Sequence, residues 1–408
     1  MNTYQKPFLG ASLAAGLALA AAPAMATTGY FSNGTSVQSK GMAGAGVSIG
    51  TGVMGAASNP AFGLKYPNQV DACLAAFMPS RSVTITGFGT FQSDNEFFPV
   101  PCIGGNFQLG NGSTLGVLVY GNGGMNTDYP INFFGGVGPL GVNLEQLFVQ
   151  VNYATEVGNG VTLGFAPIVA AQRFSATGLQ AFDAPGFTTA VGSVTDNGDD
   201  WSVGFGAQIG VLIEASPNLT FGASVRSKIK MDPFESYAGL FADAGDFDIP
   251  ASATIGMTFM PPSNSALKIT AEWQRIFYSG VGAIGNSSTT PLPLGSPGGP
   301  GFGWKDMDVF RLAAEYEVNS QWTVRGGVSY NTEFAAPIEA TFNALAPATP
   351  QLHASIGGTY RINNRREIHM SYTHAFDNDL SGPFLFAPTT ISEQMSQHEI
   401  AVGMTWKW

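Results

Sequence analysis

His369 and Ser371 form the pair of side chains whose chemistry comes nearest to that of a hydrolase, because a histidine base can activate a serine nucleophile. They lie two positions apart, a spacing that puts them on one face of any strand and that often arises by chance. No third group that would orient the histidine is evident, and a pair alone does not make a triad. The four histidines also show no clustered spacing with cysteine or aspartate, so we expect no enzyme activity, no bound metal and no cofactor.

Five basic residues have the chemistry to bind an anionic group in an interior that excludes water. Three alternate along the stretch RSKIK and two lie further on: Arg226, Lys228, Lys230, Arg311 and Arg325. We expect the first three to share the inward face of one strand, and the last two to face inward from adjacent strands. A carboxylate in a low-dielectric lumen favours such a cation. The alternative is that Glu315, Glu317 and acidic residues near the N-terminus neutralise them.

The chain has two cysteines, Cys73 and Cys102. An even number of cysteines in an oxidising compartment permits one disulfide. Both side chains serve equally well as apolar fillers on a strand surface, so the two interpretations stay open.

The composition limits the class of protein. Only 11% of the 408 residues are charged, whereas 44% are hydrophobic and 12% are aromatic. Soluble domains have about a quarter of their residues charged, so this chain is too poor in charge for a large water-exposed surface. Its formal net charge of −11 argues against nucleic acid as a partner, since the phosphates would be repelled.

The first 26 residues have the order of an export signal. Lys6 precedes the apolar run LGASLAAGLALAAA, and Ala24-Met25-Ala26 follows as a small-residue cleavage site. We therefore expect residues 1–26 to be a cleaved signal peptide. No later apolar stretch reaches the ~18 residues of a spanning helix. An exported β protein or an outer-membrane barrel remains.

Apolar and polar residues alternate through most of the remaining chain, as in WSVGFGAQIGVLIE (201–214). Because successive side chains of a strand point to opposite faces, this period indicates β-structure. The alternating runs are longer than the ~5–6 residues of a typical globular strand, and their second face is small and polar, which suits a barrel lumen. Short turns also alternate with long Gly/Pro/Asp-rich segments, as in outer-membrane barrels.

We predict an all-β fold, a fourteen-stranded antiparallel transmembrane β-barrel over residues 70–408. The expected strands are 70–88, 97–110, 114–128, 145–156, 161–176, 201–215, 219–232, 250–260, 266–278, 307–318, 322–333, 351–362, 366–377 and 396–408. An even number lets the barrel close with both chain ends in the periplasm. We expect a monomer in the outer membrane of a Gram-negative bacterium.

Residues 27–69 do not alternate and are rich in Gly, Ala and Ser. A barrel of fourteen strands is too wide for its own side chains to fill, so we predict that this segment folds back as a hatch that plugs the lumen. The alternative is a flexible periplasmic tail, although such a tail is normally richer in charge.

Apolar residues alternate with small or polar residues throughout the C-terminal run IAVGMTWKW, whose last residue is aromatic. We expect it to be the last strand, with Trp406 and Trp408 in the periplasmic aromatic girdle. A terminal aromatic residue on such a strand also looks like the signal that the barrel assembly machinery reads.

Apolar residues gather in two of the expected external loops: Phe133, Phe134, Pro139, Leu140, Phe384, Leu385 and Phe386. Exposed aromatic clusters indicate binding, here of a hydrophobic molecule that arrives through lipopolysaccharide and outer-membrane lipid. The alternative is that these residues pack the loops together or belong to the interfacial girdle.

Several motifs of the sequence resemble those of a known protein family. GYFSNGTSVQSKGMAGAGVS, then Asn59-Pro60-Ala61, and later RSKIK, AEWQRI and the block from WKDMDVFRLAAEYE to WTVRGG resemble, in order, the FadL/TodX outer-membrane transporters. The resemblance spans nearly the whole mature chain, and Asn59-Pro60-Ala61 belongs to the hatch. It implies a fourteen-stranded barrel with an N-terminal hatch and passive diffusion of long-chain fatty acids, or alternatively of aromatic or alkane hydrocarbons. An outer-membrane enzyme or adhesin is the hypothesis of another class.

The resemblance also implies where substrate passes. External loops capture it, and it moves to a site beside the hatch N-terminus, where Tyr30 and Phe31 lie in this chain. It then leaves through a side opening at a kink in the third strand. Here that strand carries Gly121, Gly123 and Gly124, which favour a bulge. Alternatively, the glycines are the top of the strand as it enters its loop.

Overall fold

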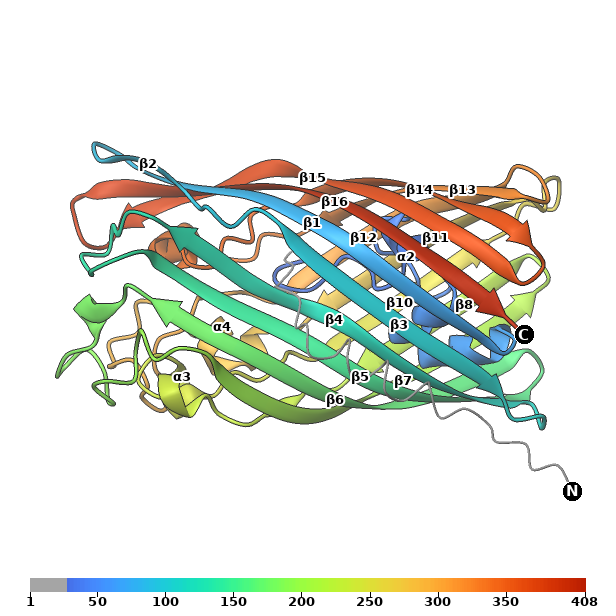
Figure 1. Ribbon diagram of the computed structural model, residues 1–408, viewed down its shortest axis with the longest axis horizontal. Helices are drawn as coiled ribbons and strands as arrows, with labels where there is room; N and C mark the ends of the chain where they lie inside the picture. Colours follow the sequence, from blue (N-terminus) through green and yellow to red (C-terminus); the bar gives the residue numbers. More distant parts are fainter. Residues whose placement is uncertain (1–27) are drawn as a thin grey trace, which may run out of the picture.

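The computed structural model describes residues 28–408, and the expected signal peptide lies outside these residues. Within residues 28–408 no helix has both the length and the apolar character that crossing a bilayer requires. The polypeptide forms one antiparallel sheet that closes on itself, because the first strand pairs with the last. Figure 1 shows the strands tilted around a central space, with the C-terminus at the end where the turns are short.

Fourteen of the sixteen strands build the wall, which confirms the predicted strand number and fold. They are β1 (Gln69–Ile85), β3 (Phe98–Gln108), β4 (Ser113–Tyr129), β5 (Leu140–Gly158), β6 (Val161–Thr177), β7 (Asp200–Ser216), β8 (Leu219–Arg226), β10 (Ser252–Phe259), β11 (Leu267–Ile276), β12 (Met307–Glu317), β13 (Trp322–Asn331), β14 (Leu352–Asn363), β15 (Arg366–Phe384) and β16 (Thr389–Lys407). The other two, β2 (Gly89–Gln92) and β9 (Lys230–Met231), are short additions that pair with β1 and β7.

Exposed and buried side chains alternate along each strand of the wall. Along β6, Phe165 and Val169 are 50% and 41% exposed, while Ala166 and Gln172 are fully buried. The apolar residues therefore face outward, where lipid lies in a membrane barrel, and the small and polar residues face inward. Several predicted bounds are wrong. β15 and β16 run seven residues further toward the external loops than expected, because they pair with each other up to Phe384 and Thr389. β5 begins five residues earlier than expected, and β8 ends six residues earlier, at Arg226.

The long connections pack over the end opposite the C-terminus, where α3 and α4 lie (Figure 1). Their short helices are η3 (Gln180–Phe182), η4 (Glu235–Tyr237), α3 (Ala242–Gly245), η5 (Tyr278–Gly280), α4 (Gly282–Gly285), η6 (Pro337–Glu339) and α5 (Ala340–Asn343). One large hydrophobic cluster joins these loops to the inward face of the upper barrel.

Residues 28–68, hereafter the N-terminal segment, precede β1 and are mostly buried. They form α2 (Val37–Lys40), η1 (Val53–Ala57) and η2 (Pro60–Lys65). Asn59 shows why the Asn-Pro-Ala motif suits this place: its side-chain oxygen caps η2 at Ala61 N–H, and its amide nitrogen donates to Val47 O and to the wall at Val211 O. An asparagine before proline thus starts a helix and fastens it to β7.

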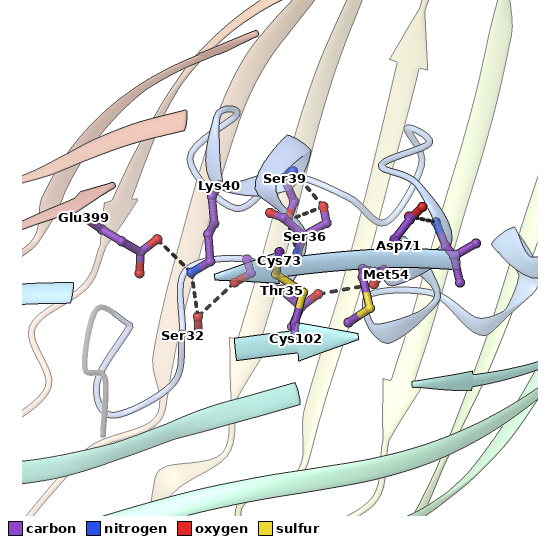
Figure 2. The surroundings of a disulfide bond; sticks show 12 residues. Ser32, Thr35, Ser36, Ser39, Lys40, Met54, Asp71, Cys73, Cys102 and Glu399 are labelled. Atoms are coloured by element: carbon purple, nitrogen blue, oxygen red, sulfur yellow. Dashed lines mark hydrogen bonds and ion pairs between the residues drawn. A yellow bond between two sulfur atoms is a disulfide. The ribbon is translucent and has the colours of Figure 1, made fainter. Parts of the chain in front are cut away.

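Acidic residues of the wall hold the same segment. Asp71 accepts from Val53 N–H at 2.6 Å, and Glu272 accepts from Gly46 and Val47 N–H at 2.9 and 2.8 Å. The Glu399 carboxylate pairs with Lys40 Nζ at 2.7 Å, which Figure 2 shows beside Ser32. Asp71, Glu272 and Glu399 belong to β1, β11 and β16. The segment is therefore fixed to three separate strands by buried contacts.

Candidate functional site

The external loops enclose an apolar cavity of about 310 Å³, the outer cavity. No charged side chain of residues 28–408 lines it, and Ser288 and Thr290 are its hydroxyl groups. Its aromatic lining residues come from five separate parts of the chain: Phe174, Phe182, Phe187, Phe241, Phe302, Phe342 and Phe386. A concave apolar site of this size accepts a hydrocarbon.

The predicted loop residues divide between lining and packing. Phe386 lines the outer cavity, and Phe134 packs behind it with ring centroids 5.2 Å apart. Phe384 ends β15 and packs on Phe386 at 5.3 Å, while Phe133 contacts Phe134 at 5.1 Å. Leu140 is the fully buried first residue of β5. The structure therefore places Leu140 in the core and not at an exposed landing site.

A second, smaller cavity of about 80 Å³ lies deeper, between the start of the N-terminal segment and the wall. We call it the inner pocket; Phe31, Tyr120, Asn122, Arg226 and Glu272 are among its lining residues. Its character is polar as well as aromatic, in contrast to the outer cavity. The inner pocket therefore has both charged and hydrogen-bonding side chains in its lining.

The glycines of β4 form a bulge in mid-strand. Gly121 pairs with Leu147 and Gly123 with Gln146, so Asn122 is the extra, unpaired residue. The strand continues to Tyr129, which rules out the interpretation that the glycines only begin a loop. The N-terminal segment closes onto this bulge, since Gly124 N–H donates to Tyr30 O at 2.8 Å and Ser32 N–H to Asn122 O at 2.9 Å.

Gly123→Ala should detach the start of the N-terminal segment from the wall, because a Cβ at this position would meet Tyr30 O at 1.8 Å. We expect a cysteine at Ser32, introduced by Ser32→Cys, to react with a maleimide several times faster in the Gly123→Ala background. Gly326→Ala is the control, since its nearest neighbour is 3.7 Å away. Equal labelling rates in the two backgrounds would show that the contact is unimportant.

Arg226 lines the inner pocket together with two other charged residues, Glu272 and Arg311. Its guanidinium lies over Phe31 at 4.7 Å and Phe148 at 5.3 Å, and Nη1 donates to Asn122 Oδ1 at 2.8 Å. Within the described residues no carboxylate pairs with it, and its buried Nε has no partner. A buried guanidinium that retains an unused hydrogen-bond donor is suited to bind an anion.

The other predicted cations are already neutralised. Arg311 Nη1 donates to Glu272 Oε1 at 2.8 Å, and Arg325 Nε donates to Glu315 Oε2 at 2.7 Å. The alternative interpretation in which Glu315 neutralises a lumen arginine is therefore correct for Arg325. The partner of Arg311 was missed, although Glu272 lies in AEWQRI on the adjacent strand and is opposite Arg311 in the register.

The prediction that Lys228 and Lys230 share the inward face with Arg226 is wrong. Strand β8 ends at Arg226, and the chain then turns so that both lysine side chains are exposed and pair with Asp248. Burial alone would raise the pKa of Asp248, but hydrogen bonds from Met231 N–H and Lys228 outweigh it and lower that pKa. These lysines stabilise an external loop and lie outside the inner pocket.

A line of aromatic rings connects the two cavities. Phe241 lines the outer cavity and lies 4.8 Å from Phe247, which lies 6.3 Å from Tyr30; Tyr30 in turn lies 5.1 Å from Phe31. Burial raises the pKa of Tyr30, so its phenol stays protonated and uncharged. The line ends at Phe31, whose ring lies under the guanidinium of Arg226.

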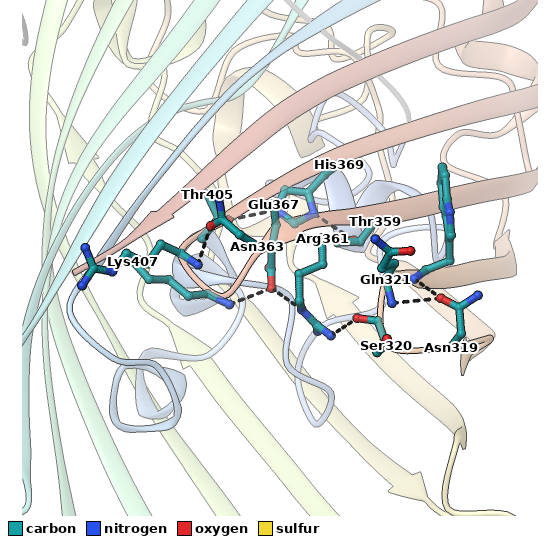
Figure 3. Close-up of polar contacts among 12 residues, drawn as sticks. Asn319, Ser320, Gln321, Thr359, Arg361, Asn363, Glu367, His369, Thr405 and Lys407 are labelled. Atoms are coloured by element: carbon teal, nitrogen blue, oxygen red, sulfur yellow. Dashed lines mark hydrogen bonds and ion pairs between the residues drawn. The ribbon is translucent and has the colours of Figure 1, made fainter.

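His369 and Ser371 do not form a catalytic pair in the part of the chain that the structure describes. The two ring nitrogens of His369 contact Thr359 Oγ1 at 2.8 Å and Thr405 Oγ1 at 2.9 Å. Figure 3 shows this histidine within a polar network near the short turns. Residues 28–408 also contain no cluster of three potential metal ligands.

Cys73 and Cys102 lie directly opposite each other on β1 and β3 and form a disulfide. Cys102 is also paired with Tyr120 of β4 in the register. The bridge therefore joins two strands at the level where the bulge of β4 begins.

Comparison with known proteins places this architecture in a family. Residues 17–381 match the family model described as outer membrane protein transport protein (OMPP1/FadL/TodX). The chain belongs to this family. As a FadL/TodX member it is an outer-membrane barrel, which confirms the family and the compartment expected from the sequence.

Individual relatives of the FadL/TodX family are distant. The long-chain fatty acid transport protein of Escherichia coli O6:H1 is 24% identical over 299 residues, which cover 64% of this chain and 66% of that relative. The Salmonella typhi protein of the same name is 23% identical, with 66% and 69% covered. The chain thus matches about two thirds of the length of these relatives.

Two crystal structures show the same fold. The toluene transporter TodX of Pseudomonas putida superimposes with a TM-score of 0.74 at 17% identity, over 92% of this chain and 99% of that one. A FadL homologue of Pseudomonas aeruginosa gives a TM-score of 0.71 at 14% identity, over 93% and 99%.

Proposed function

We propose that this protein is a passive channel for hydrophobic compounds across the outer membrane and that long-chain fatty acids are its main substrates. The observation that carries the proposal is Arg226, a buried cation without a carboxylate partner among residues 28–408. The fatty acid relatives support the substrate class by name.

The charge of Arg226 favours an anionic substrate. Burying a cation without a counter-charge is unfavourable, and stacking on two aromatic rings compensates only in part. A substrate carboxylate would supply the missing charge through charge-assisted hydrogen bonds. The apolar outer cavity and the aromatic line to Tyr30 suit the alkyl chain of the same molecule.

The proposed route has three further parts, and all of them remain proposals. The N-terminal segment acts as the hatch, the bulge at Gly121–Gly124 provides the side exit toward lipid, and residues 1–26 direct export. We also propose that the protein works as a monomer, meets lipopolysaccharide at its loops and requires the barrel assembly machinery for insertion.

Aromatic hydrocarbons are the second candidate substrates. The described part of the chain contributes no charged side chain to the lining of the outer cavity, which favours an uncharged ligand there. Some structural neighbours are also named toluene transporters. An adhesin or an enzyme has no comparable support from the described residues.

Uptake into cells that lack their own FadL/TodX proteins tests the proposal. We expect expression of the full chain to accelerate uptake of labelled oleate more than uptake of labelled toluene, and a strain with the empty vector gives the baseline. Faster uptake of toluene alone would favour the second candidate. Uptake of neither compound above the baseline would contradict the channel function itself.

A further inference from the structure

Three amide side chains form a continuous hydrogen-bonded row across the inner wall, hereafter the amide ladder: Asn122 of β4, Gln146 of β5 and Gln172 of β6. Asn122 Nδ2 donates to Gln146 Oε1 at 2.8 Å, Gln146 Nε2 to Gln172 Oε1 at 2.8 Å, and Gln172 Nε2 to Phe247 O at 2.9 Å. All three are buried, with exposures of 5%, 4% and 0%. Buried amides are retained in such a row only when each is satisfied.

The ladder has a direction and two meaningful ends. Arg226 Nη1 donates to Asn122 Oδ1 at 2.8 Å, so every bond runs from the guanidinium toward the carbonyl of Phe247. Aligned hydrogen bonds polarise one another in a low-dielectric interior. One end is the cation of the inner pocket, and the other is the residue whose ring lies between the two cavities.

The strand register and alternation explain how the ladder is built. Gln146 and Gln172 are directly opposite each other in the register of β5 and β6. Gly121 pairs with Leu147 and Gly123 with Gln146, so the extra residue Asn122 lies beside Gln146. Its side chain faces inward by the same alternation that turns Leu118 and Tyr120 inward.

We infer that Asn122, Gln146 and Gln172 are positioning residues that hold Arg226 ready for a carboxylate and link its orientation to Phe247. This inference rests on the proposed function. Arg226 uses one donor on the ladder, and its Nε has no partner among residues 28–408, so donors remain for the substrate. Glu272 lines the same pocket, but its two oxygens accept from Arg311 and from the N–H groups of Gly46 and Val47.

Two ligands that share the same alkyl chain test the ladder. Oleate has a carboxylate and oleyl alcohol has none. With the full chain in detergent, we expect Gln146→Met and Gln172→Met each to weaken oleate binding about tenfold. Binding of oleyl alcohol should change less than about twofold, which also shows that the variants fold. Gln397→Met is the matched control, because Gln397 is a buried amide of β16 outside the ladder.

If the glutamine variants lose affinity equally for oleate and oleyl alcohol, or keep it for both, the proposed role of the ladder is wrong. Arg226→Met separates this inference from the proposed function. If it lowers the preference for oleate while the glutamine variants do not, the ladder is wrong and carboxylate recognition stands. If Arg226→Met leaves the preference unchanged, carboxylate recognition fails and the ladder fails with it. Combining Arg226→Met with Gln172→Met should reduce the preference no further than Arg226→Met alone.

Discussion

Arg226→Met should weaken binding of oleate by about thirtyfold or more and leave binding of oleyl alcohol nearly unchanged. Truncating one partner of a buried, hydrogen-bonded charge pair removes about 2–5 kcal/mol, and about 1.4 kcal/mol corresponds to a factor of ten in affinity. Methionine keeps most of the volume of the arginine stem but lacks the guanidinium that lies over Phe31 and Phe148. The alcohol lacks the charge that Arg226 recognises, so its affinity depends on the apolar path alone.

Arg325→Met provides the matched control for this result. Arg325 is also buried and inward-facing, but it pairs with Glu315, which keeps Lys268 as a second partner at 2.8 Å. Oleate affinity should therefore be retained in Arg325→Met. Titration of both ligands against the two variants and the unchanged protein measures the difference. An equal decrease for oleate in both variants would mean that the lumen responds only to its total charge.

Glu399→Ala should release part of the N-terminal segment from the wall. The pair of Lys40 and Glu399 is almost fully buried, with side-chain exposures of 4% and 6%. Removing one partner of a buried pair destabilises by about 3–5 kcal/mol, since the remaining charge is left without compensation. We expect the variant to show ion conductance in planar bilayers that the unchanged protein lacks, because the segment no longer fills the lumen.

Glu214→Ala tests whether burial is the reason. Glu214 also pairs with the N-terminal segment, at Lys65, but the two side chains are 47% and 33% exposed. Exposed pairs contribute about 1 kcal/mol or less, so this variant should conduct no more than the unchanged protein. Similar conductance in both alanine variants would indicate that the segment does not depend on the buried charge.

The wall was predictable from the sequence because alternate residues of a strand face lipid and lumen, so the two faces appear as a period of two in the sequence, as in β6 and β7. The failure at Lys228 has a physical cause. The alternation of RSKIKM continues past Arg226, yet β8 ends there and the chain forms a bridge from Ile229 to Ile249. Periodicity describes one segment and does not reveal which partner that segment will pair with.

The outer cavity lay beyond sequence reasoning for a related reason. Phe182, Phe342 and Phe386 come from three loops, and each loop alone is an ordinary turn with one or two aromatic residues. Their meeting depends on the closed order of the strands beneath them. The amide ladder was missed as well, although alternation along β4 already places Asn122 on the same inward face as Leu118 and Tyr120.

The ion pair of Lys40 and Glu399 also bears on how the barrel is assembled. Lys40 precedes the first strand and Glu399 belongs to the last, so neither charge can be compensated by the other until β16 has joined β1. A barrel that still lacks its final strand would have to bury a bare ammonium group in order to fill its lumen, which is strongly unfavourable. Seating of the N-terminal segment is therefore coupled to completion of the chain, and the finished pair distinguishes a whole barrel from a partial one.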